Sequence, residues 1–353
     1  MTTRKRVRVG VIGAGSFAIA SHLPNLARHD DVEFVGVARL GVSELHRVAS
    51  RYGFRVATED YREVLEAGVD VAVVASPSAL HFEHASAALE SGAHVLVEKP
   101  VTIDPEHAWS LAATAARVGR SVVVSFPWNY APLVQTAKSI LDEQGIGELE
   151  QLTVSMSSVT RELLSNTGSY PGADETTAPE PATWTDPRLS GGGYAQAQLT
   201  HALGLALWTT GARARGAFAK MTAPLEAPVE LHDAVVYEFE GGAIGTMSGG
   251  SGHLGFNDNR HAIQVRAIGS RGQYLLDLER EAAWIFRDGK EIRVPVKPGE
   301  GAHNGAPPVD TILAAARGDS YINQSPAELG ARVVEALALA YRSASSGEWE
   351  TRV

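Results

Sequence analysis

The sequence predicts an α/β protein of two domains, in which a doubly wound parallel sheet is followed by a domain with a large, mostly antiparallel open sheet. The chain has 353 residues, which is more than a single hydrophobic core usually holds. Strand-like and helix-like segments alternate up to residue 126, whereas strand-like segments follow one another directly beyond residue 210. We therefore expect one domain over residues 1–125 and a second over residues 126–353.

The parallel sheet is indicated by apolar runs of strand length, separated by segments of helical period. We expect strands over residues 7–12, 33–38, 69–75, 94–98 and 121–126, and helices over residues 16–29, 42–52, 80–91 and 105–118. The run Val69–Ala75 is almost wholly apolar, which is typical of a strand that is covered on both faces. Connections of this length favour right-handed crossovers between parallel strands.

The second domain has a different pattern. Residues 160–190 are rich in Pro, Thr, Gly and Ser, which predicts a long loop or lid. Helices are expected over residues 133–144, from Gly193 to about 209, over 308–316 and over 326–345. Strands are expected over residues 148–157, 217–221, 233–239, 243–251, 261–267, 272–278, 282–286 and 291–296.

A large sheet with helices on one face leaves its other face to be covered. A second copy of the chain is the simplest cover. We therefore expect a homo-oligomer, either a dimer or a tetramer, that forms through the C-terminal sheet.

Composition excludes several classes of protein. The formal net charge of −10 argues against a nucleic-acid partner, and the absence of cysteine excludes disulfides, thiolate metal sites and a cysteine nucleophile. No apolar run is long enough to span a membrane, and the first strand leads into a glycine turn rather than a secretion signal. These features favour a cytoplasmic protein without a membrane partner. The histidines lack metal-ligand spacing, so no metal is expected.

A glycine turn, Gly13-Ala14-Gly15-Ser16-Phe17-Ala18, joins the first expected strand to the first helix. Gly13 permits a tight turn, Gly15 lets the backbone approach a pyrophosphate, and Ala18 allows close helix–strand packing. The free N–H groups of the helix start can receive the phosphates. Residues 1–125 are thus predicted to be a Rossmann domain that binds NAD or NADP through Gly13, Ala14, Gly15, Ser16 and Phe17.

Arg39 stands at the end of the second strand, where an acidic residue usually binds the ribose of NAD. An ion pair between Arg39 and a 2′-phosphate would favour NADP, whereas stacking of the guanidinium on adenine would tolerate NAD. A solvated surface arginine is the third interpretation. The preference between NAD and NADP therefore stays open.

Two further motifs follow expected parallel strands, at the end where open α/β sheets bind ligands. They are Ser76-Pro77 with His81, and Val97-Glu98-Lys99-Pro100. With the glycine turn and a Gly-Gly-Gly helix that carries a histidine, they make the whole chain similar to the Gfo/Idh/MocA oxidoreductases. The resemblance implies a Rossmann domain and an α/β substrate domain whose open sheet often mediates oligomerisation. It also implies a sugar- or polyol-like substrate and hydride transfer with NAD(H) or NADP(H).

The resemblance assigns roles in the first domain by position. Ser76 and Pro77 would wall the nicotinamide, His81 would stand near it, and Glu98 would touch the nicotinamide ribose or hold Lys99. Lys99 would hydrogen-bond the reacting hydroxyl. The next residue is Pro100, and the corresponding peptide bond is cis in relatives. Chemistry supports the lysine independently, because burial beside a cationic nicotinamide lowers the pKa of an amine toward a useful range.

The other site element is the helix after Gly191-Gly192-Gly193. In the family it often carries an Asp and, one turn later, a His that both face the substrate. His201 fits the histidine position, but Ala197 stands where the Asp is expected, so the chain lacks the carboxylate of the usual acid–base pair. Gln198 is a candidate for a substrate hydrogen bond, whereas Gln196 is expected to project elsewhere. Lys99 or Tyr194 is expected to share the role of base.

Trp128 and Asn129 follow the last expected strand of the first domain, where relatives line the boundary between cofactor and substrate. With Tyr130, they are candidates for stacking on a sugar face, and a packed domain junction is the competing interpretation.

We expect an NAD(P)-dependent oxidoreductase that transfers a hydride between nicotinamide and a secondary alcohol of a sugar, polyol or glycoside. The alternative is a redox-neutral, NAD-dependent glycoside-cleaving enzyme, which oxidises a hydroxyl, eliminates the aglycone, adds water and returns the hydride. The missing carboxylate at Ala197 keeps this alternative open. A dinucleotide-sensing regulator would keep the glycine turn but would not need Lys99.

Overall fold

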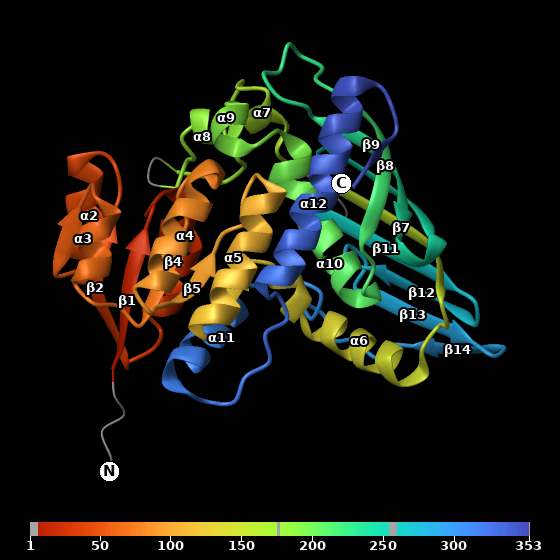
Figure 1. Cartoon of the computed structure of the whole chain (residues 1–353), viewed down its shortest axis with the longest axis horizontal. Coiled ribbons are helices and arrows are strands. Elements are labelled where there is room, and N and C mark those ends of the chain that lie inside the picture. The colour runs from red at the N-terminus through yellow and green to blue at the C-terminus, as the bar shows by residue number, and fades with distance from the viewer. Residues whose placement is uncertain (1–5, 175–176, 254–259, 353) are drawn as a thin grey trace. The chain divides into compact units, whose positions relative to one another are not determined.

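The computed structural model describes residues 6–174, 177–253 and 260–352 (Figure 1). The chain forms two compact units. Unit 1 contains Met1–Ser125, Gly172–Thr183 and Gly305–Ala331, and unit 2 contains Phe126–Pro171, Trp184–Asn304 and Arg332–Val353. Two segments beyond residue 125 thus belong to the unit that carries the glycine turn.

Unit 1 is built on a six-stranded sheet in the order β3-β2-β1-β4-β5-β6, and every pairing in it is parallel. Its strands are β1 (Val7–Ile12), β2 (Val32–Ala38), β3 (Val56–Thr58), β4 (Val71–Val74), β5 (His94–Val97) and β6 (Val122–Val124). Its helices of six or more residues are α2 (Val42–Tyr52), α3 (Tyr61–Glu66), α4 (His81–Glu90), α5 (Pro105–Val118) and α11 (Ala306–Arg317). The doubly wound parallel sheet predicted from the sequence is confirmed.

Helix ends in unit 1 follow local sequence signals. Asp104 precedes α5 and accepts hydrogen bonds from the N–H groups of Glu106 and His107, with Pro105 in the first turn. The same helix ends at Gly119, whose φ of 64° lies in the left-handed region that glycine adopts without strain. These signals explain why the predicted limits of α5 match the observed ones.

The helix that follows the glycine turn differs from the uniform helix expected over residues 16–29. Residues Ala18–His22 form a π turn, η1, and a short α1 (Leu23–Leu26) completes the helix. Pro24 has no N–H to donate within the helix, and the Leu23 N–H bonds the Ala18 carbonyl five residues earlier. Proline therefore accounts for the widened turn.

Unit 2 is built on a nine-stranded sheet in the order β14-β13-β12-β11-β7-β10-β9-β8-β15. Only the β10–β7 pairing among these is parallel, so the predicted mostly antiparallel sheet is confirmed. Its strands are β7 (Leu149–Ser158), β8 (Ala214–Thr222), β9 (His232–Phe239), β10 (Ile244–Ser251), β11 (His261–Gly269), β12 (Gly272–Asp277), β13 (Ala282–Arg287), β14 (Lys290–Arg293) and β15 (Glu350–Thr351).

Helices α6 (Pro132–Gln144), α10 (Thr200–Thr210) and α12 (Ala327–Ser346) cover one face of this sheet (Figure 1). Side chains of β9 alternate accordingly. Asp233, Val235 and Tyr237 are buried toward the helices, whereas Ala234 and Val236 are exposed on the open face. This period of two is what the sequence pattern indicates.

The described residues between 160 and 190 are less irregular than expected, since they contain three short helices. These are α7 (Arg161–Leu164), α8 (Ala182–Thr185) and α9 (Pro187–Ser190). Asp186 caps α9 by accepting the N–H of Arg188, a local interaction too short-ranged to produce a visible period in the sequence. Over the described parts of the chain, no helix combines the length and apolar character needed to cross a membrane.

Candidate functional site

The glycine turn between β1 and the first helix has the geometry of a dinucleotide cradle. Gly13 has a φ of 82°, and a Cβ there would lie 2.3 Å from the backbone N of Ser76. A Cβ at Gly15 would meet nothing nearer than the Gly13 carbonyl oxygen at 4.0 Å, so this side of the turn is open. Glycine at these positions fits the close approach of a pyrophosphate to the backbone.

Arg39 folds back over the same turn. Its Nη1 donates to the Ala14 carbonyl at 3.0 Å and its Nε donates to the Leu40 carbonyl at 3.3 Å. Within the described residues Arg39 forms no ion pair with a carboxylate. Its charge is therefore held next to the glycine turn without a direct counter-ion.

His81 connects the two loops that follow β4 and β5. Its Nδ1 lies 2.8 Å from the Pro100 carbonyl oxygen and its Nε2 lies 2.8 Å from the Ser76 carbonyl oxygen. The ring is buried, which lowers its pKa, while the hydrogen bonds to both carbonyls and the charge of Glu98 raise it. His81 thus holds the Ser76-Pro77 loop against the segment that carries Lys99, whose peptide bond to Pro100 is cis.

Lys99 follows a buried carboxylate. Glu98 Oε1 lies 2.7 Å from His22 Nε2, and Glu98 Oε2 accepts the Lys99 backbone N–H at 3.2 Å. Burial by itself raises the pKa of Glu98, but the hydrogen bond and charge of His22 and the charge of Lys99 bring it below its usual range. Burial lowers the pKa of Lys99, and the charge of Glu98 opposes this in part. An amine of lowered pKa at the end of β5 suits proton transfer.

In unit 2, the start of the helix that carries His201 is anchored by Glu230. The carboxylate accepts the Gly193 N–H at 2.8 Å and the Ala195 N–H at 3.2 Å, and it accepts the Tyr341 hydroxyl at 2.5 Å. The Tyr341 oxygen in turn accepts the Gln196 N–H at 3.3 Å. These bonds satisfy N–H groups that a helix start otherwise leaves unpaired.

The same helix begins with a second π turn, η4 (Ala195–Leu199), in which the Thr200 N–H bonds the Ala195 carbonyl. The spacing of four residues between Ala197 and His201 would place them on one face of a regular α-helix. In this widened turn it does not correspond to one full turn. Gln196, which is five residues before His201, has the spacing of a π turn. Gln196 and Gln198 are buried, and within the described residues neither side-chain oxygen has a hydrogen-bond partner.

Tyr194 is fully buried beneath β7. Its hydroxyl donates to the Met156 carbonyl at 3.2 Å and accepts from Ser158 at 3.1 Å. Burial raises the pKa of Tyr194 well above its usual range, which does not suit a base. Its predicted contact with substrate remains a prediction.

Trp128 lies in the turn η3 (Pro127–Tyr130), where it is buried among imidazole rings. Its ring centroid is 5.0 Å from that of His201, 5.1 Å from that of His261 and 4.9 Å from that of His303. Asn129 beside it is fully buried. Among the described residues, no group of three or more His, Cys, Asp or Glu side chains has the geometry of a metal site.

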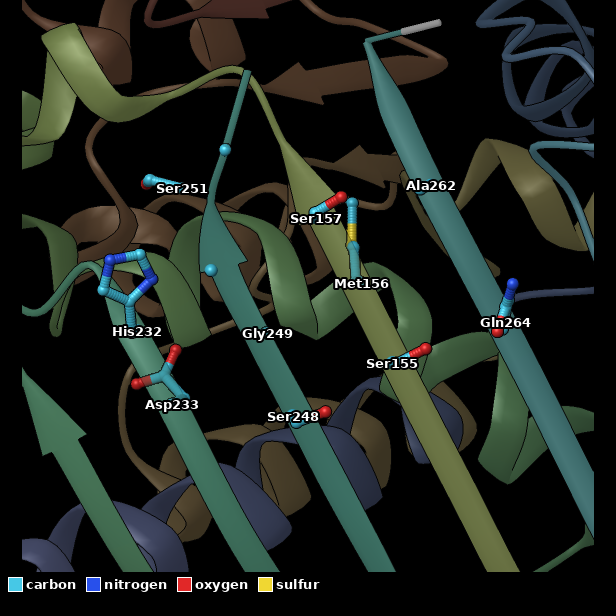
Figure 2. A pocket seen from close by; sticks show the side chains of 12 residues that line it. Ser155, Met156, Ser157, His232, Asp233, Ser248, Gly249, Ser251, Ala262 and Gln264 are labelled. Carbon is cyan, nitrogen blue, oxygen red and sulfur yellow. The ribbon is translucent and has the colours of Figure 1, made fainter. Parts of the chain in front are cut away.

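A separate pocket of about 490 Å³ lies across β9, β10, β7 and β11 (Figure 2). Its lining includes Ser155, Ser157, His232, Ser248 and Gln264, and none of the predicted site residues is part of it. Figure 2 shows helices behind these strands. The helix that carries His201 packs on that far side, since a Cβ at Gly249 would lie 2.6 Å from Leu199 Cδ2.

Two parts of the chain match the domain models of one known protein family. Residues 7–126 match the model of an oxidoreductase family with an NAD-binding Rossmann fold, and residues 134–275 match the C-terminal domain of the same family. The chain belongs to the Gfo/Idh/MocA oxidoreductases. The predicted resemblance is thereby confirmed.

Among Gfo/Idh/MocA relatives, D-glucoside 3-dehydrogenase of Escherichia coli (strain K12) is 32% identical over 148 residues, which is 42% of this chain and 42% of the relative. A dTDP-3,4-didehydro-2,6-dideoxy-α-D-glucose 3-reductase of Saccharopolyspora spinosa is 27% identical over 78% of this chain and 75% of its own length. The match to the first of these relatives spans less than half of that protein.

Solved structures agree with the Gfo/Idh/MocA fold. An inositol dehydrogenase homolog from Azotobacter vinelandii, complexed with NAD⁺, has a TM-score of 0.79 at 20% identity and covers 99% of this chain and 98% of its own. Levoglucosan dehydrogenase, complexed with NADH and levoglucosan, has a TM-score of 0.77 at 20% identity over 98% of this chain and 99% of its own. At such identities the likeness shows the fold.

Several residues around the predicted site are absent from the sequence-based expectations. His22 lies in the helix after the glycine turn and contacts Glu98, which is 76 positions away. Glu230 contacts Gly193, which is 37 positions away. His261 and His303 are weighed in the sequence only as metal ligands. Their contact with Trp128 is the feature that marks them as site residues. The sequence does not show this contact, because it forms only in the folded chain.

Proposed function

We propose that this protein is an NAD(P)-dependent oxidoreductase that transfers a hydride between nicotinamide and a secondary alcohol of a sugar, polyol or glycoside. The observation that carries the proposal is Lys99, an amine of lowered pKa at the end of β5, in the same unit as the glycine cradle. The sugar dehydrogenases and reductases among the relatives support the substrate class.

Lys99 is proposed to hydrogen-bond the reacting hydroxyl and to take its proton as the alcohol is oxidised. The bound nicotinamide supplies the hydride acceptor. Glu98, fixed by His22, orients the backbone of Lys99 and favours its charged form after proton transfer. Gly13, Ala14, Gly15, Ser16 and Phe17 are proposed to hold the dinucleotide phosphates, and Ser76, Pro77 and His81 to shape the nicotinamide end.

In unit 2, His201, Gln198, Trp128, Asn129 and Tyr194 are the proposed substrate-binding residues. The buried amide oxygen of Gln198 lacks a partner within the described residues, which suits a hydroxyl donor from a sugar. Ala197 supplies no carboxylate, so Lys99 carries more of the proton transfer than in relatives with the acid.

Arg39 is proposed to decide between NAD and NADP. A guanidinium without an ion pair beside the glycine turn favours a ribose 2′-phosphate, whereas the NAD complexes among the structural neighbours favour NAD.

The open face of the unit 2 sheet is proposed to bind a second copy of the chain. Three apolar side chains on strands β8, β9 and β10 each expose more than two fifths of their surface. They are Phe218, Val236 and Ile244. Covering such residues is the usual reason that open sheets associate.

The missing carboxylate at Ala197 favours one second candidate, the redox-neutral cleavage of a glycoside. In this reaction the dinucleotide oxidises a sugar hydroxyl to a ketone, which makes the neighbouring C–H acidic. Loss of that proton then expels the aglycone. Water then adds and the hydride returns, so that the dinucleotide is unchanged over the cycle.

One assay separates the two candidates. The purified protein is incubated with NAD⁺ or NADP⁺ and a panel of inositol, levoglucosan and aryl glucosides. Net formation of reduced dinucleotide supports the dehydrogenase, whereas aglycone release without it supports the redox-neutral cleavage. Neither product with any member of the panel would count against both.

A further inference from the structure

Three imidazole rings surround one buried indole in unit 2. We propose that His261 and His303 join His201 as hydroxyl-binding residues for a sugar or polyol. The proposal rests on the proposed function and names the groups that recognise its substrate. No feature of the sequence around either histidine assigns it this role.

All three imidazole rings are steeply inclined to the indole ring of Trp128. His201, His261 and His303 stand at interplanar angles of 83°, 70° and 75° to it. His261 and His303 are nearly parallel to each other, at 21° and 6.2 Å between centroids. The three histidines come from α10, from the start of β11 and from the loop before residue 305, so the fold gathers them from distant positions.

Exposure distinguishes this cluster from ordinary core packing. Trp128 and His201 are buried, whereas His261 is half-buried and His303 is exposed. Solvent therefore reaches two of the three histidines beside the buried indole.

The chemistry of imidazole matches hydroxyl groups. A neutral ring has one nitrogen that donates and one that accepts, and a sugar hydroxyl does both. The Tyr170 hydroxyl lies 3.5 Å from His261 Nε2, close enough to orient that ring, and Arg260 stacks over Tyr170 at 5.6 Å. The cluster therefore suits a ligand rich in hydroxyl groups.

The test is titration calorimetry with inositol, levoglucosan and methyl glucoside, with and without NADH, so that binding is measured without turnover. We expect His261→Phe and His303→Phe each to weaken binding of the best of these sugars about three- to tenfold, the effect of losing one hydrogen bond. His261→Asn keeps a donor and an acceptor and should retain more affinity than His261→Phe. His232→Phe, on the open face of the same sheet (Figure 2), is the matched control and should leave affinity unchanged.

A packing role predicts the opposite order, with the phenylalanine variants tolerated and His261→Asn impaired. That order overturns the proposal, as does affinity that stays unchanged in both phenylalanine variants or the failure of the wild type to bind any of the three sugars. A parallel assay measures formation of reduced dinucleotide. If the variants' affinities follow the expected order but no reduced dinucleotide forms, the result supports the histidine assignment and counts against the proposed function.

Discussion

Glu98 and His22 form a buried pair that links the helix of the glycine turn to the residue before Lys99. Glu98 Oε1 lies 2.7 Å from Nε2 of His22, which is the last residue of the π turn before Pro24. Removing one partner of a buried pair typically costs about 3–5 kcal/mol, because the other charge is left uncompensated.

We therefore expect His22→Asn to lower the free energy of unfolding by an amount in this range and to reduce turnover through Lys99. Because the pKa of Glu98 is lowered in the folded protein, the pair stabilises the fold at neutral pH. That contribution is lost as the pH falls below 4.5, the ordinary value for glutamate. Urea unfolding at neutral and acidic pH measures both effects, with His46→Asn on the exposed face of α2 as the control. Equal stability of His22→Asn and wild type at neutral pH would contradict the pairing.

The interactions that can be predicted from the sequence are those between neighbours along the chain. Gly13 and Gly15 act within one turn, and Asp104 caps a helix that begins at the next residue. The position of Lys99 follows from its place after a strand. Each of these depends on local geometry that a short motif specifies.

The interactions that escape sequence analysis join residues far apart. Glu230 binds Gly193 N–H across 37 positions, and Trp128 meets His303 across a still longer separation. The π turn at Ala195–Leu199 also changes which residues share a face with His201, and periodicity at 3.6 residues cannot reveal it. Such contacts depend on how the sheet of unit 2 brings strands together.

Arg39→Asp tests the cofactor preference. If Arg39 binds a 2′-phosphate, the substitution removes a charge-assisted hydrogen bond of about 1.5–3 kcal/mol and adds repulsion, so NADP⁺ should lose several kcal/mol of binding while NAD⁺ is spared. Titration of both dinucleotides measures the change, and Arg117→Asp, at an exposed site in the last turn of α5, is the control. An unaltered ratio of the two affinities would make Arg39 a surface charge.

Asp233 is a buried carboxyl whose two oxygens have no hydrogen-bond partner in the described residues. Burial, and then the charge of Glu230, raises its pKa to about 8. The folded protein thus keeps a proton that an unfolded aspartate, with an ordinary pKa of 3.8, has lost, and stability falls as the pH rises between these values.

We expect Asp233→Asn to match wild type near pH 4 and to be more stable by about 4–5 kcal/mol near pH 8, since the amide has no proton to lose. Chemical unfolding at the two pH values measures the difference, with the exposed Asp142→Asn as the control. A gain of the same size at both values would rule out the titration of Asp233 as its cause.

Val236→Asp tests self-association. A charge on the open face should weaken an interface that we expect to bury at least about 1,000 Å². Light scattering should give a multiple of the chain mass of 37.4 kDa for wild type and a shift toward the monomer for the variant. Ile322→Asp, at an exposed site in unit 1, should behave as wild type. A strictly monomeric wild type would refute this proposal.

The central claim, that Lys99 moves the proton of the reacting alcohol, is tested most directly by Lys99→Ala. Turnover with the best sugar should fall by about 10²–10⁴-fold, the usual contribution of a general acid–base group, while dinucleotide binding stays close to wild type. The control Lys290→Ala, on exposed β14, should keep full activity. Parallel measurement of turnover and dinucleotide affinity in the two variants gives the answer. A Lys99→Ala protein that binds dinucleotide normally and retains wild-type turnover would contradict the account.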